Sequence, residues 1–123
     1  MSIAALPRPA DELPAIYQQF LADLRASGFT GEIQDDYATR TLFATDNSLY
    51  QLAPQAAVFP KDAEDVQRVA TLLGQPAYQM VALAPRGGGT GTNGQSLTHG
   101  LVMDLSRHMN RILEINVEEG WVR

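Results

Sequence analysis

The sequence contains no cysteine. The chain can therefore form no disulfide, no thiolate metal site and no cysteine nucleophile, and this composition agrees with a reducing compartment such as the cytoplasm. Long apolar runs are absent too: the longest, residues 80–84, has five residues, whereas a membrane-spanning helix needs roughly 20. No basic segment followed by an apolar one opens the chain, so no secretory signal is visible. We expect a cytoplasmic protein without a membrane span.

Positive charge is also scarce. Nine Lys and Arg stand against fourteen Asp and Glu, giving a formal net charge of −5. Binding to nucleic acid depends on clustered Lys and Arg, so we expect no nucleic-acid partner. The two histidines, His99 and His108, have no carboxylates at ligand spacing, and we expect no metal site. The hydrophobic share of 45% is enough to bury the core of one domain.

Two segments have the pattern of amphipathic helices. In the first, apolar residues recur at three- and four-residue steps; Asp11 can cap its start and Gly28 can end it. The second begins after Asp62, which can cap it, and ends at Gly74. Residues 29–55 have no sustained period and are rich in polar side chains, so we predict that they are mainly loop.

Several short segments have the pattern of strands. Residues 56–59 precede the second helix and residues 80–84 follow it, which predicts two parallel strands in a right-handed βαβ unit. Residues 101–105 and 112–117 have the two-residue period of strands, with residues 101, 103 and 105 on one face of the first and residues 113, 115 and 117 on one face of the second. The predicted fold class is therefore α+β, with an N-terminal helix and a small mixed sheet that contains a βαβ unit.

The last three residues, 121–123, begin another β-type run after a turn. A strand of this length leaves ladder groups unpaired and exposes a sheet edge, which natural domains avoid. We therefore expect the chain to be the N-terminal piece of a longer polypeptide. The exposed edge could also pair two copies into a homodimer.

Five of the ten glycines lie between positions 87 and 94. Successive main-chain N–H groups in such a loop converge into a concave nest that favours anions. The loop follows a predicted buried strand, so it lies at a carboxyl edge of the sheet, where open α/β sheets bind ligands. The sequence thus predicts a phosphate site, to which Arg86 could add charge and Thr90 and Asn93 could add hydrogen bonds.

Other interpretations of this loop fit the sequence less well. A Walker A loop needs Lys after its last glycine, whereas Gln95 follows Gly94. Gly89, Gly91 and Gly94 match the dinucleotide fingerprint G-x-G-x-x-G, but that fingerprint must open a helix, and residues 101–105 have the pattern of a strand. A purely structural turn is a further alternative, although a turn of this length seldom needs five glycines. A phosphate cradle without a helix behind it is the preferred interpretation.

The same residues carry a resemblance to a known family. Residues 85–91 (PRGGGTG), preceded by an AVFP strand and a capped helix and followed by GLVMDLS at 100–106, resemble the first FAD-binding subdomain of the vanillyl-alcohol-oxidase (PCMH-type) flavoproteins. Residues 44–50 (ATDNSLY) and 104–111 (DLSRHMNR) are most similar to large bacterial D-2-hydroxyacid dehydrogenases, of the D-lactate or D-2-hydroxyglutarate kind. In that group the flavin module is followed by an iron–sulfur half.

The resemblance implies a domain division and a cofactor site. Residues 1–43 would form a helical extension and loop, and residues 44–123 the first part of an FAD-binding PCMH-type domain. Relatives that bond the flavin covalently through this loop carry His where this sequence has Thr90, so non-covalent FAD is implied. The implied cofactor-binding residues are Arg86, Gly87, Gly88, Gly89, Thr90, Gly91, Asn93, Gly94, Leu105 and Ser106.

The resemblance also implies an activity for the longer protein. FAD would accept a hydride from the α-carbon of a small D-2-hydroxyacid, giving a 2-oxoacid. The second FAD subdomain, the substrate cap, the catalytic residues and the iron–sulfur cysteines are expected beyond Arg123, in the rest of the same polypeptide. This piece should then hold no catalytic residue and be inactive alone. The alternative function is a non-catalytic interaction domain that docks a partner through its glycine loop and open sheet edge.

Overall fold

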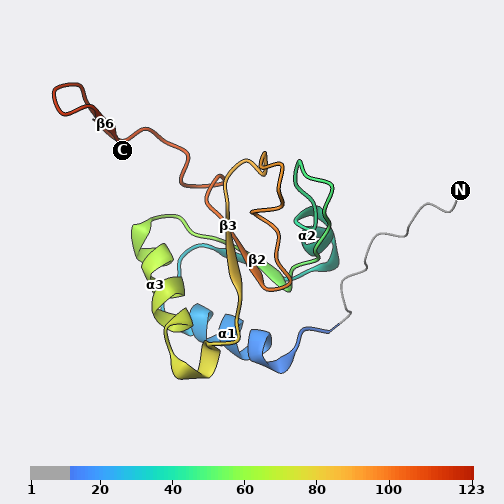
Figure 1. The fold of residues 1–123 in the computed structure, drawn as a ribbon. Coiled ribbons are helices and arrows are strands. Elements are labelled where there is room, and N and C mark those ends of the chain that lie inside the picture. The colour runs from blue at the N-terminus through green and yellow to red at the C-terminus, as the bar shows by residue number, and fades with distance from the viewer. Residues whose placement is uncertain (1–11) are drawn as a thin grey trace, which may run out of the picture.

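The computed structural model describes residues 12–123 (Figure 1), so Asp11, the predicted cap of the first helix, lies outside the described residues. Helices and strands alternate from residue 15 to residue 73, and a 3-10 helix and then strands alone follow. The elements in order are α1 (Ala15–Ala26), β1 (Glu32–Gln34), α2 (Tyr37–Leu42), β2 (Ala56–Phe59), α3 (Ala63–Leu73), a 3-10 helix (Pro76–Tyr78), β3 (Leu83–Arg86), β4 (Leu101–Asp104), β5 (Ile115–Asn116) and β6 (Trp121–Val122).

Four strands form one mixed sheet in the order β1-β2-β4-β3. Strands β2 and β3 both pair in parallel with β4, so that Val102 lies opposite Ala57 on one side and Ala84 on the other, while β1 is antiparallel to β2. The α+β class and the mixed sheet are as predicted. The two strands joined by α3 are not neighbours, however, because β4 lies between them.

Both faces of the sheet are covered, which explains why β2 and β4 are apolar along almost their whole length. Helices α1 and α3 pack together and cover one face, and α2 lies on the opposite side of the strands from α3 (Figure 1). Alternate strand residues point to each face. Phe20, Leu21, Leu24 and Val69 pack with Ala56, Val58, Leu101 and Met103 on the first face, and Phe43 packs with Ala57, Phe59 and Val102 on the second.

The signals at both ends of α3 and at the end of α1 are confirmed, whereas the N-cap of α1 is Pro14 and not the predicted Asp11. The carboxylate of Asp62 accepts a hydrogen bond of 2.9 Å from the N–H of Asp65, which caps α3, and Gly74 follows its last turn. Gly28 follows α1 with a φ of +85°, a left-handed conformation that glycine adopts without strain.

Residues 29–55 are mainly loop, as predicted, but they also contain two short elements, β1 and α2. Helix α2 is capped by Asp36, which accepts a 3.0 Å hydrogen bond from the N–H of Thr39. Both elements are too short to reveal a period in the sequence, and β1 exists through its pairing with β2.

The strand predicted at 80–84 begins later, at Leu83. The side chain of Met80 is 83% exposed, whereas Tyr78 just before it is buried with its ring packed edge-on against Phe20. The 3-10 helix therefore ends by burying its aromatic residue, and the chain needs several more residues to enter the sheet.

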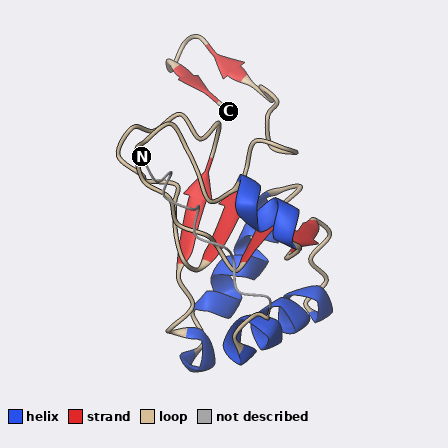
Figure 2. Ribbon diagram, turned by 90° about the vertical axis from the view of Figure 1, so that its right-hand side faces the viewer, coloured by secondary structure: helices blue, strands red, loops and turns tan. Residues whose placement is uncertain are grey.

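The hairpin of β5 and β6 stands apart from the four-stranded sheet (Figure 2). Within the alternating segment 112–117 only Ile115 and Asn116 form a strand, and the apolar side chains of Ile112, Leu113 and Val117 are exposed. A turn ending at Gly120 joins the two strands, as predicted. In residues 12–123 no helix is long and apolar enough to span a bilayer.

Candidate functional site

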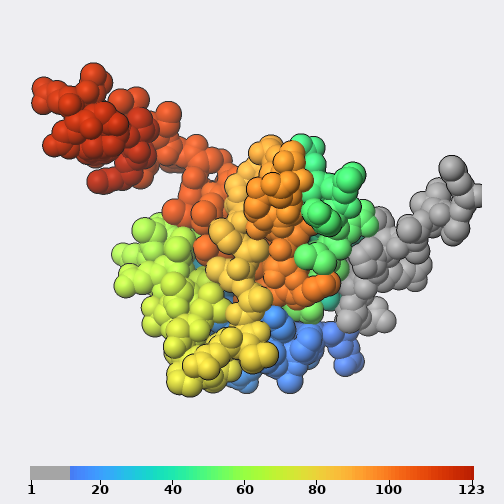
Figure 3. Space-filling model, in the orientation of Figure 1, coloured from blue at the N-terminus to red at the C-terminus, as the bar shows by residue number. Residues whose placement is uncertain are grey.

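The glycine loop, defined here as residues 86–96, connects the carboxyl end of β3 to β4. It forms part of the orange surface at the top of Figure 3. The N–H of Leu105, just after β4, donates a 2.9 Å hydrogen bond to the carbonyl of Arg86. This bond places Leu105 at the base of the loop.

A cavity of about 280 Å³ opens on the loop. The main-chain N–H groups of residues 87–92 donate no hydrogen bond to any other residue within the described part of the chain. A concave run of unused N–H donors is a site that favours an anion. The lining residues are Pro85, Gly87, Gly88, Gly89, Thr90, Gly91, Gln95 and Ser96.

Neither the backbone conformation nor the packing within the chain requires glycine at positions 87 and 88. Neither glycine has a φ in the left-handed region. A Cβ atom added to Gly87 would meet nothing within 4 Å, and one added to Gly88 would meet only the Thr90 Cγ2 atom at 3.6 Å. The missing side chains therefore leave open space in front of the main chain, as a close approach by a ligand requires.

Gly89 is glycine for a different reason. Its φ is +66°, and an added Cβ would lie 2.4 Å from a guanidinium nitrogen of Arg86. The Arg86 side chain folds beneath the loop, donates a 2.8 Å hydrogen bond to the carbonyl of Thr45 and lies 5.1 Å from the ring centroid of Phe43. Its guanidinium is thus engaged within the chain, and Arg86 is not among the residues that line the cavity.

The other predicted residues lie around the same loop. Thr90 and Gly91 line the cavity, whereas Asn93 and Gly94 line a neighbouring hollow of about 230 Å³. Ser106 is turned toward β4: its N–H and its hydroxyl each donate a 2.8 Å hydrogen bond to Asp104. The structure therefore gathers these residues at one edge of the sheet but does not place all of them on one cavity.

Sequence reasoning missed three contributors to the site. Gln95 and Ser96 line the cavity, and Asp46 accepts a 3.2 Å hydrogen bond from the Ser96 hydroxyl. The motif at 44–50 that carries part of the resemblance was the only sequence signal for Asp46. Its contact with the loop joins residues fifty positions apart.

Asp46 is held as a carboxylate beside the loop. A hydrogen bond with the side chain of Ser48 is the largest cause that lowers the pKa of Asp46 below its usual 3.8. Desolvation opposes this shift, while the main-chain N–H of Ser48, the Ser96 hydroxyl and the charge of Arg86 add to it. The opposite charges of Asp46 and Arg86 partly offset each other, and the main-chain N–H groups of residues 87–92 have no partner within the described part of the chain.

The dinucleotide-fingerprint interpretation is excluded. The segment after the loop enters β4, and no helix lies between Arg86 and Leu101. The match of Gly89, Gly91 and Gly94 to G-x-G-x-x-G is therefore accidental. What the loop offers is main-chain N–H groups on a strand–loop–strand frame.

Comparisons with known proteins agree on one kind of domain. The sequence profile of a family described as "FAD binding domain" matches residues 54–123. D-2-hydroxyglutarate dehydrogenase of Pseudomonas putida is 72% identical over 109 residues, and the enzyme of the same name from Escherichia coli is 52% identical over 115 residues. These matches cover 89% and 91% of this chain but only 11% of each relative, so the chain spans about a ninth of their length.

A solved structure shows the same fold. The fold of an alkyldihydroxyacetonephosphate synthase superposes with a TM-score of 0.68 at 23% identity. The match covers 89% of this chain and 22% of that one. The likeness supports the predicted PCMH-type architecture of the sheet and its covering helices.

Proposed function

Because this chain belongs to the FAD binding domain family, we propose that its glycine loop holds the diphosphate of a non-covalently bound FAD. The observation that carries the proposal is the run of unused main-chain N–H groups at residues 87–92, with open space in front of Gly87 and Gly88. A diphosphate needs several converging donors and a close approach to the main chain. The unused N–H groups and the open space at Gly87 and Gly88 support this role.

The chemistry belongs to the longer protein of which this chain would be one part. Relatives at 72% and 52% identity are D-2-hydroxyglutarate dehydrogenases, which supports a D-2-hydroxyacid, a small hydroxylated carboxylate, as the substrate. FAD, when bound, supplies the acceptor for the hydride that leaves the α-carbon as a 2-oxoacid forms. The residues of this chain bind and orient; we assign no catalytic residue to it and expect the piece alone to be inactive.

Each residue of the loop would have its own role in this proposal. The N–H groups of Gly87 to Gly91 would bond the phosphate oxygens, and the Thr90 hydroxyl could add a donor from the same cavity. Leu105 and Ser106 would lie near the cofactor from the end of β4. Thr90 offers no imidazole for a bond to the flavin, so acid denaturation of the full-length polypeptide should release all of its flavin into the supernatant.

The test of the cradle is Gly88→Ala in the full-length polypeptide. A Cβ placed in the ligand space should raise the dissociation constant of FAD by about tenfold or more, which corresponds to roughly 1.4 kcal/mol. The thermal unfolding midpoint of the FAD-free protein should not change, since the added Cβ meets no crowded neighbour.

The matched control is Gly74→Ala, at the end of α3. An added Cβ there meets only ordinary contacts, at 3.5 Å and 3.6 Å, with carbonyl oxygens of the last turn of the helix. This variant should bind FAD as the parent does. Unchanged FAD affinity in Gly88→Ala, measured by fluorescence titration, would contradict the cradle.

Several finer expectations stay predictions. The iron–sulfur cluster would be held outside this chain, and iron and sulfide analysis of the full-length polypeptide would test it. A homodimer through the sheet edge, a cytoplasmic location and the division into residues 1–43 and 44–123 are likewise untested. The relatives, which are named as dehydrogenases, do not favour the alternative of a non-catalytic interaction domain.

A further inference from the structure

One segment far away in the sequence contacts both arms of the glycine loop. The first arm contains Arg86 and Gly89, and the second arm contains Gly94 and Ser96. This flanking segment, residues 43–50, lies beside the loop at the top of Figures 1 and 3. The N–H of Asn47 donates a 3.0 Å hydrogen bond to the carbonyl of Gly89, in the first arm. The carboxylate of Asp46 accepts a 3.2 Å hydrogen bond from the hydroxyl of Ser96, in the second arm. The two arms are therefore tied to the same support.

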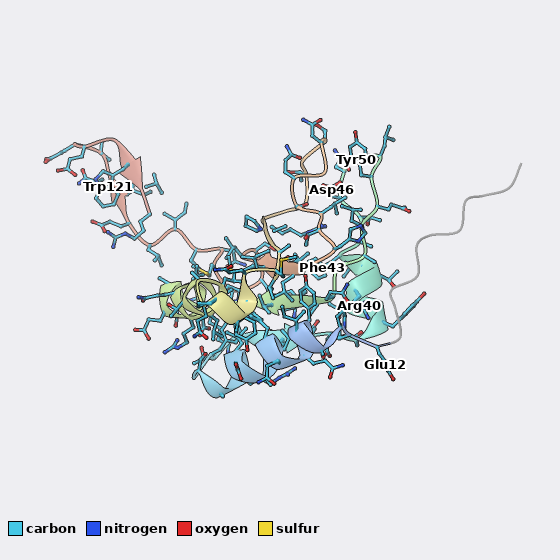
Figure 4. All side chains as sticks on the ribbon, turned by 60° about the horizontal axis from the view of Figure 1, so that its bottom comes forward. Glu12, Arg40, Phe43, Asp46, Tyr50 and Trp121 are labelled. Atoms are coloured by element: carbon cyan, nitrogen blue, oxygen red, sulfur yellow. The ribbon has the colours of Figure 1, made fainter. Side chains whose placement is uncertain are left out.

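The flanking segment is itself closed by hydrogen bonds. Asp46 accepts a 2.8 Å hydrogen bond from the N–H of Ser48, whose hydroxyl accepts one of 3.1 Å from the N–H of Tyr50. The N–H of Leu52 donates a 3.0 Å bond to the carbonyl of Ala44, which closes the base of the segment. In Figure 4 Asp46 and Tyr50 lie in the loops above the sheet, with Phe43 below them next to the strands.

Arg86 anchors the first arm to the core. Its guanidinium occupies the space beneath Gly89 and bonds the carbonyl of Thr45. It also lies against Phe43, which is buried and packs edge-on against Phe59 with ring centroids 5.6 Å apart. The position of the first arm is thus fixed from below by a side chain that does not line the ligand cavity.

The second arm is fixed from the side. An added Cβ at Gly94 would lie 3.1 Å from the ring of Tyr50, so the main chain there passes closely over the flanking segment. Asp46 reaches the same arm through Ser96, and its other oxygen is already held by Ser48. The bond from Ser48 therefore fixes the position of the Asp46 carboxylate, which accepts the hydrogen bond from Ser96 in the second arm.

We propose that Asp46 and Arg86 are positioning residues that hold the two arms of the glycine loop in the shape that binds a diphosphate before the ligand arrives. The inference rests on the proposed function of the loop. A loop with five glycines would otherwise lose much conformational entropy on binding, and fixing it in advance removes that cost from the binding step. Neither side chain has to touch the ligand.

The experiment compares Asp46→Ala and Ser96→Ala with the parent in the full-length polypeptide. The first readout uses the protein without FAD: trypsin cleaves after arginine, and the Arg86 side chain is engaged beneath the loop, so cleavage between Arg86 and Gly87 should be slow. Each variant should speed this cleavage about fivefold or more. The second readout is FAD affinity, which should fall by about fivefold or more in the same variants.

Two further variants separate positioning from general damage. Ser96→Thr keeps the hydroxyl and should restore slow cleavage and FAD affinity toward the parent values. Leu49→Ala, in the same segment, removes a fully exposed side chain and should change neither readout. The thermal unfolding midpoints of the Asp46 and Ser96 variants should stay within a few degrees of the parent.

The outcomes are distinguishable. Unchanged cleavage and FAD affinity in both Asp46→Ala and Ser96→Ala would overturn the positioning role while leaving the FAD site intact, provided that Gly88→Ala still weakens binding. Equal acceleration at every tryptic site would show general destabilisation and would also overturn it. If the parent itself bound no FAD, the proposed function would fail, and the cleavage readout would still decide whether the bond between Asp46 and Ser96 holds the loop.

Discussion

Thr30 is bound twice by the carboxylate of Asp65. The main-chain N–H and the hydroxyl of Thr30 each donate a 2.9 Å hydrogen bond, one to each carboxylate oxygen. Asp65 is fully buried, and it also accepts a 3.1 Å bond from the N–H of Lys61 and pairs with Arg68 at 3.2 Å. One carboxylate therefore joins the start of α3 to the chain that leads from α1 into β1, and fixes both helices on the same face of the sheet.

Replacing Asp65 should destabilise the fold strongly. Asp65→Ala removes the buried carboxylate that accepts hydrogen bonds from Thr30 and Lys61 and pairs with Arg68, and we expect a loss of about 3 kcal/mol in the free energy of unfolding. Glu64→Ala is the control, because Glu64 is largely exposed and forms only a surface pair with Arg68, whose removal should cost about 0.5 kcal/mol or less. Urea unfolding measures both. Equal losses in the two variants would show that the buried hydrogen bonds of Asp65 do not stabilise the fold.

The same carboxylate should make stability depend on pH. Burial raises the pKa of Asp65, but hydrogen bonds from Thr30 and Lys61 and the charge of Arg68 outweigh it, so the pKa lies below the usual 3.8. Because the unfolded chain then binds the proton more tightly than the folded one, the stabilisation is complete above the unfolded value and is lost as pH falls through the folded-state value. Unfolding free energy should decline below about pH 4, and the decline should be shallower in Asp65→Asn. Parallel curves would contradict this assignment.

Features whose cause is local could be predicted from the sequence. The cap of α3 at Asp62 depends on residues within one turn, and the five glycines between positions 87 and 94 predict the loop. Strand β4 was predicted from the two-residue period of residues 101–105, and the structure buries both of its faces. By contrast β1 forms only because β2 offers it a partner, and no pattern of three residues can reveal that.

The support of the glycine loop depends on contacts between distant residues. The bond from Arg86 to Thr45 spans 41 positions, and the bond from Ser96 to Asp46 spans 50. Arg86 was expected to add charge to the site because arginine often binds phosphate. Only the packed structure shows that Phe43 and Thr45 engage its guanidinium beneath the loop.

Replacing Gly100 or Gly87 by alanine should have different effects on the free energy of unfolding. An added Cβ at Gly100 would lie 2.1 Å from the carbonyl oxygen of Ala82, which itself accepts a 2.8 Å hydrogen bond from the N–H of Leu101. Gly100→Ala must shift that main chain, and we expect it to lower the free energy of unfolding by about 2 kcal/mol. Gly87→Ala, with nothing within 4 Å, should leave unfolding unchanged in the FAD-free protein and weaken FAD binding. A stability loss in Gly87→Ala would show that its space is already used by the chain.

Arg107 is predicted to stabilise the fold through an aromatic ring more than through its ion pair. Its guanidinium carbon lies 3.7 Å from the ring centroid of Phe59, and its Nη1 atom lies 2.8 Å from a carboxylate oxygen of Glu32. Lysine can keep the ion pair but cannot stack in the same way, so Arg107→Lys should lower the free energy of unfolding by about 0.5–1 kcal/mol.

Salt separates the two contributions of Arg107. Roughly 1 M NaCl screens the partly exposed pair with Glu32 but leaves the stack on Phe59 in place, so the deficit of Arg107→Lys should persist in high salt. Arg111→Lys is the matched control, because the Arg111 side chain makes no ion pair or ring contact with any residue in the described part of the chain. Chemical unfolding at low and high salt measures both variants. A deficit that vanishes in high salt would assign the stabilisation to the ion pair with Glu32, because only that contribution is screened.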